Sequence, residues 1–113
     1  REVSELAYAE YITIDLPNHE YLGEAVKSQL LYYPSVTREP FKNRGRATDL
    51  LASGKLQEDL GLPKLDAARD RIMICGSPAL NKDMRELLDA RGFVEGTTTT
   101  PGDYVVERAF VEQ

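Results

Sequence analysis

The sequence contains few of the residues from which metal centres and disulfide frameworks are built. Its 113 residues include one cysteine, Cys75, and one histidine, His19. A single cysteine excludes an internal disulfide and a cysteine-rich zinc site, and a single histidine argues against a histidine-based metal site or a Ser-His-Asp triad. We therefore expect no metal ion in this chain, and we interpret His19 as a surface residue at the start of a helix.

The sequence also lacks a long apolar run and an excess of basic residues. A membrane-spanning helix needs about 18 consecutive apolar residues, and the apolar stretches near 30–33 and 72–75 are much shorter. The chain has 14 lysine and arginine residues against 19 aspartate and glutamate residues, whereas a nucleic-acid-binding surface is basic. No basic-then-apolar leader is seen. We expect a cytoplasmic protein with no membrane span and no nucleic-acid partner.

The spacing of apolar residues predicts helices and strands in alternation. The chain begins within a helical pattern and without an initiator methionine, which indicates a piece of a longer protein. Helices are expected at 3–14, 19–28, 47–53, 55–60 and 77–90, and strands at 30–33, 70–76 and 104–111. Strands separated by helices are typical of a single α/β layer fold with a mostly parallel sheet.

The most informative segment joins the second predicted strand to the helix that follows it. In open parallel sheets, ligands bind at the carboxyl ends of the strands. Gly76 allows a ligand to approach the backbone closely, and a helix that starts at Ser77 favours an anionic or polar ligand group. Cys75 would lie at the mouth of this crevice, although the alternative of a small buried hydrophobe at a strand end stays open.

A basic loop at 37–46 follows the first predicted strand. It carries four basic residues and one acidic residue in a chain that is otherwise acidic. Arginine binds phosphate through two parallel hydrogen bonds, so Arg38 and Arg46 are candidates for an anion site, to which Thr37 would add a hydroxyl donor. The alternative is a solvated basic loop.

The final predicted strand carries a carboxylate, Glu107, between apolar residues. This position suits either a surface residue of an edge strand or a positioned acid, and the spacing alone leaves both open. Phe110 lies near the end of the chain, and a phenylalanine in such a position is more typical of a core residue than of a ring-stacking platform.

Four segments, taken together and in order, closely resemble the bacterial ferredoxin (or flavodoxin)–NADP reductases. They are LYYPSVTREPF at 31–41, NRGR at 43–46, MICGSP at 73–78 and YVVERAFVE at 104–112. The resemblance implies a flavoprotein with an FAD-binding β-barrel followed by an NADP-binding α/β domain. The NADP-binding domain of this family has three layers, with helices on both faces of a mostly parallel sheet. Residues 1–113 would be the C-terminal part of that domain.

The resemblance also implies which residues contact the nucleotide. Thr37, Arg38 and Arg46 resemble the clamp on the 2′-phosphate and adenosine of NADP, and Arg1 is similar to an arginine that faces the nucleotide. Ser77 belongs to the segment that binds the cofactor after the strand.

Further implied residues lie beside the reacting rings. Cys75 and Gly76 resemble the pair beside the nicotinamide, and Glu107 resembles the acid that supports nicotinamide binding and electron or proton exchange. Ala109 stands where plant-type members end in an aromatic ring on the flavin. Phe110, in the bacterial extension, would lie against FAD.

The implied reaction is hydride exchange between NADPH and FAD, coupled to electron transfer with ferredoxin or flavodoxin. The family's glycine-rich pyrophosphate loop and its FAD domain are absent from this sequence. Asn81 replaces an expected apolar residue, a change that costs little if the side chain faces solvent. Three alternatives remain: a flavin reductase of the same superfamily with another acceptor, a non-catalytic nucleotide-binding module, and a scaffold fragment without a ligand.

Overall fold

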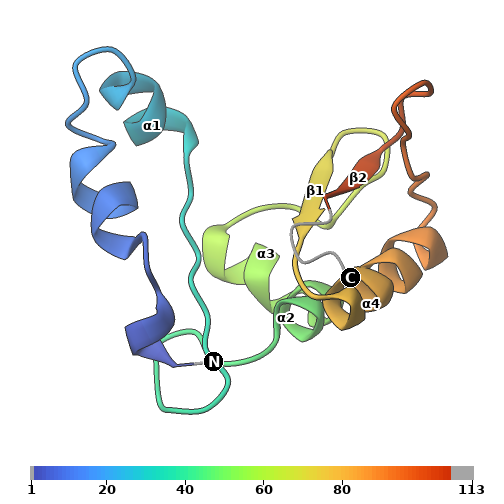
Figure 1. The fold of residues 1–113 in the computed structure, drawn as a ribbon, viewed down its shortest axis with the longest axis horizontal. Coiled ribbons are helices and arrows are strands. Elements are labelled where there is room, and N and C mark those ends of the chain that lie inside the picture. Colours follow the sequence, from blue (N-terminus) through green and yellow to red (C-terminus); the bar gives the residue numbers. More distant parts are fainter. Residues whose placement is uncertain (1, 108–113) are drawn as a thin grey trace. The chain divides into compact units, whose positions relative to one another are not determined.

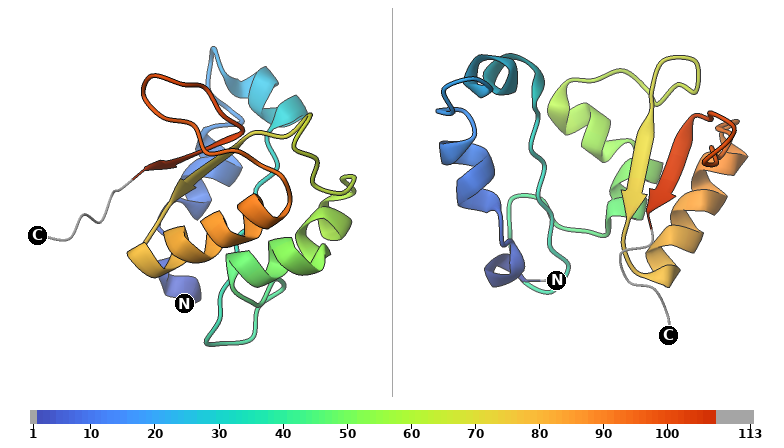
Figure 2. Two further views of the ribbon diagram at one scale, coloured as in Figure 1. Left: turned by 90° about the vertical axis from the view of Figure 1, so that its right-hand side faces the viewer. Right: turned by 45° about the horizontal axis from the view of Figure 1, so that its top comes forward.

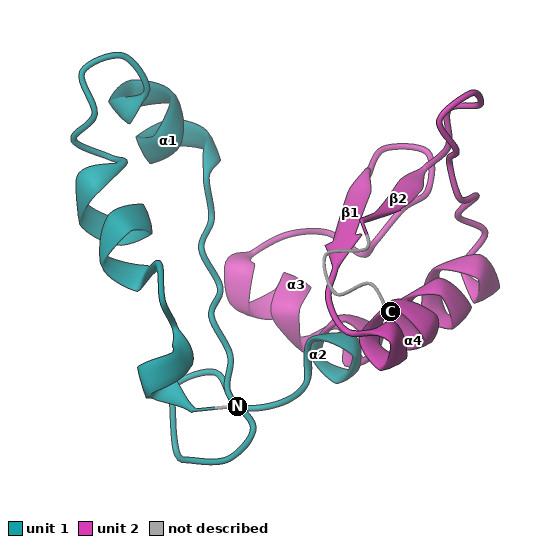
Figure 3. Cartoon of the chain, viewed as in Figure 1, with its two compact units in different colours: residues 1–50 teal, residues 51–113 magenta. Residues whose placement is uncertain are grey.

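The computed structural model describes residues 2–107, and the chain forms two compact units, 1–50 and 51–113 (Figure 3). The first unit contains a 3-10 turn at Val3–Glu5, a π-helical turn at Tyr11–Asp15 and helix α1 at Gly23–Gln29 (Figure 1). Helix α2 at Ala47–Ser53 spans the boundary between the units. The second unit adds helix α3 at Lys55–Leu60, strand β1 at Ile72–Cys75, helix α4 at Pro78–Ala90 and strand β2 at Tyr104–Glu107.

The first predicted helix is broken into short turns. Leu6 ends the 3-10 turn with non-helical dihedral angles, φ −80° and ψ 74°. Further on, the Thr13 hydroxyl donates to the Ala9 carbonyl at 2.7 Å, and such local bonds of short polar side chains bend helices. The apolar spacing therefore predicted the helical character of this region but not its interruptions.

Helix α1 begins later than its predicted start at residue 19. The His19 Nδ1 accepts hydrogen bonds from the backbone N–H groups of Tyr21 and Leu22, both at 3.1 Å. Since His19 is exposed, it lies on the surface in the turn that leads into α1, in agreement with the sequence interpretation.

The prediction of a strand at 30–33 is wrong. This segment leaves α1 as extended chain, and β1 and β2 form the one sheet found among residues 2–107. A strand requires a neighbouring backbone to take up its N–H and C=O groups, and an apolar run does not say whether that neighbour exists. The described sheet consequently has two strands, not the three expected.

Strands β1 and β2 are parallel and are connected through α4, which makes a β-α-β unit (Figure 2). Their register pairs Ile72 with Tyr104 and Cys75 with Glu107. One face of this sheet packs against α4, and the core consists of Ile74, Leu88, Phe93 and Tyr104. This unit has the predicted α/β class with a parallel sheet. The helices predicted at 47–53, 55–60 and 77–90 are confirmed as α2, α3 and α4.

Two polar contacts join α4 to β2 and to the segment that leads into β2. The Tyr104 hydroxyl donates to Asp89 Oδ1 at 2.7 Å, and burial, followed by this carboxylate, raises the pKa of Tyr104 far above its usual range. Arg85 binds Glu95 through Nε and Nη2 at 3.1 and 3.2 Å. Both bonds run from α4 to the segment that carries β2.

The loop before β2 is closed by two glycines in contact. A Cβ atom on Gly102 would lie 2.6 Å from the Gly96 Cα, a distance that real Cβ atoms do not reach. Two backbone hydrogen bonds lie next to this contact. Gly96 N–H donates to the Tyr104 carbonyl and Asp103 N–H donates to the Val94 carbonyl, both at 2.7 Å. The threonine-rich loop at 97–101 therefore projects from a narrow, hydrogen-bonded neck.

The turn before β1 is expected to loosen in acid. Asp66 accepts a hydrogen bond from Ala68 N–H at 2.9 Å, and this bond, followed by Arg69, lowers the pKa of Asp66. A carboxyl with a lowered folded-state pKa stabilises the turn above its unfolded value and ceases to do so as the pH falls through the folded one. The protection factor of the Ala68 amide, which is its exchange rate relative to the intrinsic rate at the same pH, should thus decrease below about pH 4. An Asp66→Asn variant should lose that dependence, and equal pH profiles for both proteins would contradict the assignment.

No helix among residues 2–107 is both long enough and apolar enough to cross a membrane.

Candidate functional site

The carboxyl end of β1 leads through a tight turn into α4. Ser77 is the N-cap of this helix, since its Oγ accepts a hydrogen bond from Leu80 N–H at 3.2 Å, and Pro78 supplies the first helical residue. Gly76 is buried, and a Cβ atom there would overlap the Leu80 side chain. A side chain at position 76 would therefore have to displace the Leu80 side chain, so glycine suits the packing of this turn on α4 whatever binds outside it.

Cys75 and Glu107 are direct partners across the parallel ladder. Paired residues of neighbouring strands project from the same face of a sheet, about 4.8 Å apart along the hydrogen-bonding direction. Both residues are exposed, so Cys75 is not the small buried hydrophobe of the alternative reading. The register therefore brings together the two residues predicted to be catalytic.

The same face of the sheet continues as an open apolar strip. Met73 and Val105, two residues before Cys75 and Glu107, are paired with each other and are 85% and 40% exposed. Alternate strand residues lie on one face, so the thiol and the carboxylate stand at the carboxyl end of this strip. The opposite face is the one that packs on α4.

The predicted phosphate-binding residues lie in the first unit, on a loop closed by a backbone bridge. Val36 and Arg44 form an isolated parallel bridge, with Gly45 N–H donating to the Val36 carbonyl at 2.9 Å. Because the bridge is parallel, the two segments leave it in the same direction. Thr37 and Arg38 follow one side, and Gly45 and Arg46 follow the other.

The guanidinium groups of Arg38 and Arg46 are available to an anion. Arg38 and Arg46 are exposed, Thr37 is half-buried, and neither arginine has an ion pair within residues 2–107. The one acid of the loop, Glu39, accepts a hydrogen bond from Val3 N–H. The loop thus brings the three predicted residues to one end of its bridge.

Three predicted site residues, Arg1, Ala109 and Phe110, lie outside the described residues. The expectation for Asn81 depended on its facing solvent, but it is 6% exposed, and its Oδ1 has no hydrogen-bond partner among the described residues. The helical period could have shown this, because Asn81 precedes Met84 and Leu88 on the buried stripe of α4.

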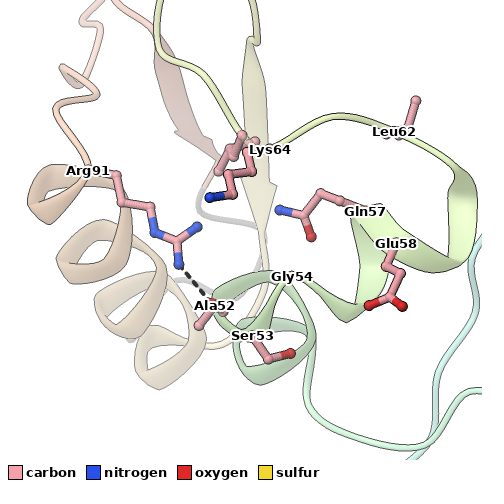
Figure 4. A pocket seen from close by; sticks show the side chains of 9 residues that line it. Ala52, Ser53, Gly54, Gln57, Glu58, Leu62, Lys64 and Arg91 are labelled. Atoms are coloured by element: carbon pink, nitrogen blue, oxygen red, sulfur yellow. Dashed lines mark hydrogen bonds between the residues drawn. The ribbon is translucent and has the colours of Figure 1, made fainter.

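A separate pocket lies at the other end of α4, within the second unit (Figure 4). Its volume is about 600 Å³. Arg91 lines it and donates from Nη2 to the Ala52 carbonyl at 2.8 Å, and Gln57 and Lys64 project toward the same space. None of the residues predicted from sequence lines this pocket. No cluster of three metal-ligating side chains is found in residues 2–107.

The chain is similar over its whole length to proteins of known function. The chain is 56% identical, over its whole length, to a ferredoxin–NADP reductase of Pseudomonas aeruginosa. It is 55% identical, again over its whole length, to a ferredoxin–NADP reductase of Azotobacter vinelandii. In both cases it spans 44% of the relative. No protein-family model matches the chain.

A solved structure shares the fold. A crystal structure of a ferredoxin NADP⁺ reductase from Neisseria gonorrhoeae, with bound FAD and NADP, superposes with a TM-score of 0.60 and 29% sequence identity. The superposition covers 68% of this chain and 32% of that protein. The α/β arrangement with its parallel strands is therefore that of a part of this reductase.

Proposed function

Because the chain is homologous over its whole length to part of the bacterial ferredoxin–NADP reductases, we propose that it is the C-terminal part of the NADP-binding domain of such an enzyme. The complete protein would be a cytoplasmic oxidoreductase that moves electrons between NADPH and ferredoxin or flavodoxin through FAD. The single observation that carries the proposal is the identity of more than half of all residues across the full chain.

The basic loop would bind the 2′-phosphate of NADP. Arg38 and Arg46 extend from the same end of the Val36–Arg44 bridge, and two guanidinium groups suit a phosphate dianion. Thr37 would add a hydroxyl donor, and Arg1 would face the same nucleotide. Because NADP differs from NAD only by this phosphate, the loop would select NADP.

The end of β1 would hold the nicotinamide. Cys75 and Glu107 stand side by side on an exposed face, with Gly76 and Ser77 forming the turn next to them. The thiol would position the ring, and the carboxylate would support its binding and the exchange of a proton. Such positioning of reacting groups is a large part of catalysis in cofactor enzymes.

FAD would be held mainly by a domain outside this chain, with Ala109 and Phe110 as contacts from this side. When bound, the flavin supplies the chemistry that links a two-electron hydride donor to a one-electron carrier. Glu107, the last described residue of β2, would mark where the chain approaches it. The carrier, ferredoxin or flavodoxin, would dock on the complete protein.

The test is reduction of the full-length protein under anaerobic conditions. We expect bound flavin whose absorbance is bleached by NADPH, and electrons that then pass to ferredoxin or flavodoxin. A protein that binds NADPH but carries no flavin would be a non-catalytic nucleotide-binding module. A flavin that is bleached without reduction of either carrier would indicate a reductase with another acceptor.

Replacement of Cys75 by serine should slow flavin reduction and leave NADPH affinity unchanged. The thiol is exposed beside Glu107, so its loss would displace the ring without removing any phosphate contact. A small misplacement of reacting groups costs about tenfold or more in rate. Stopped-flow reduction with a parallel NADPH titration measures both quantities. Met73→Ser, on the same face of β1, is the control, and equal rates for Cys75→Ser and wild type would refute the role.

A further inference from the structure

Three hydrogen bonds close the base of the basic loop. Val36 N–H donates to the Asn43 carbonyl at 3.1 Å, and Gly45 N–H donates to the Val36 carbonyl at 2.9 Å. The third bond runs from Asn43 Nδ2 to the Pro34 carbonyl at 2.9 Å. Together they join residues 34–36 to residues 43–45.

Asn43 has a special part in this closure because it uses both its backbone and its side chain. Pro34 is buried, and a buried carbonyl that loses its partner is costly. The half-buried Asn43 amide satisfies this carbonyl across nine residues of chain, while its own carbonyl holds Val36. Val36 is itself fully buried, so one of the residues that close the base is shielded from solvent.

The bonds of Asn43 determine where the arginines begin. Arg38 lies two residues after Val36, and Arg46 lies two residues after the bridge residue Arg44. If the two segments separate, the two guanidinium groups no longer start from neighbouring points. Both groups could then bind one phosphate only if the loop became ordered on binding. The entropy cost of this ordering would lower the affinity for the phosphate.

We propose that Asn43 is a positioning residue for NADP selectivity: its side chain closes the basic loop on Pro34 and so presents Arg38 and Arg46 together to the 2′-phosphate. The inference rests on the proposed function of the loop. Asn43 does not touch the nucleotide in this scheme. Through Arg38 and Arg46 it acts mainly on the binding of the 2′-phosphate, the group by which NADPH differs from NADH.

The experiment compares Asn43→Ala with Asn18→Ala in the full-length protein. Asn18 is the matched control, because its Nδ2 also donates to a backbone carbonyl of the same unit, that of Ile14 at 2.7 Å, outside the loop. We expect Asn43→Ala to raise the Kd of NADPH about threefold to tenfold. The Kd of NADH and the rate at saturating NADPH should stay within about twofold of wild type, and Asn18→Ala should match wild type for both nucleotides.

The outcomes separate the positioning role from a general structural one and from the function itself. Equal weakening of NADPH and NADH, or no change in either, overturns the role of Asn43. A wild-type protein without preference for NADPH overturns the proposed function instead. Asn43→Ser, which keeps a short polar side chain at the half-buried position, is a second variant for which the same selective loss is expected, so poor folding of Asn43→Ala would not protect the proposal.

Discussion

Alanine at Arg38 or at Arg46 should weaken NADPH binding by about 10- to 100-fold and leave NADH binding nearly unchanged. A hydrogen bond between charged partners contributes about 1.5–3 kcal/mol, which corresponds to this range of affinity. Both guanidinium groups are exposed and have no ion pair within residues 2–107, so neither must leave a protein partner to bind phosphate. Titration of the full-length protein with each nucleotide measures the effect.

Lys42→Ala is the control for the loss of one positive charge. Lys42 is exposed and belongs to the same loop, but it lies at neither end of the Val36–Arg44 bridge. We expect it to change NADPH affinity by about threefold or less, through long-range attraction only. If the arginine variants lost as much affinity for NADH as for NADPH, the phosphate assignment would be contradicted. It would also be contradicted if Lys42→Ala bound NADPH as weakly as the arginine variants do.

The second large effect is expected at Tyr104. Its side chain is 1% exposed in the core of the second unit, and removal of a large buried ring costs about 3–5 kcal/mol of unfolding free energy. Tyr104→Phe keeps the ring and loses only the bond to Asp89 at 2.7 Å, so its cost should be about 1–3 kcal/mol. Chemical denaturation of the full-length protein measures both.

Exposed tyrosines provide the comparison. Tyr21 is 83% exposed, and Tyr21→Ala should change stability by no more than about 0.5 kcal/mol. Amide exchange along β1 and β2 should rise in Tyr104→Ala, because the register partner of Ile72 is then lost from the core. A Tyr104→Ala protein as stable as Tyr21→Ala would show that the ring does not support the sheet.

Local signals predicted the second unit well. Ser77 and Pro78 are a cap and a first-turn residue that specify the start of α4 without reference to distant parts of the chain. Gly54 and Gly92 have positive φ of 84°, which explains why each stands at a helix boundary. These features depend on a few neighbouring residues, and the sequence displays them directly.

The features that the sequence did not reveal depend on pairing between distant segments. The apolar run at 30–33 does not show whether another backbone pairs with it, and the structure assigns no strand to it. The adjacency of Cys75 and Glu107 depends on the register of two strands separated by a helix. The contribution of Asn43 likewise depends on a bond to Pro34 across the loop. The candidate residues could be named from sequence, whereas their grouping required the structure.

The contact between Gly96 and Gly102 allows the loop at 97–101 to change in sequence and length without altering the sheet. Because the backbone closes on itself at this neck, extra residues at 97–101 would add only a small loop-closure entropy. Homologues can therefore lengthen, shorten or diversify this tip while Tyr104 and Glu107 keep their places. For the same reason, the tip at 97–101 is a suitable point for attaching a fluorescent label, because a label there would not disturb the sheet.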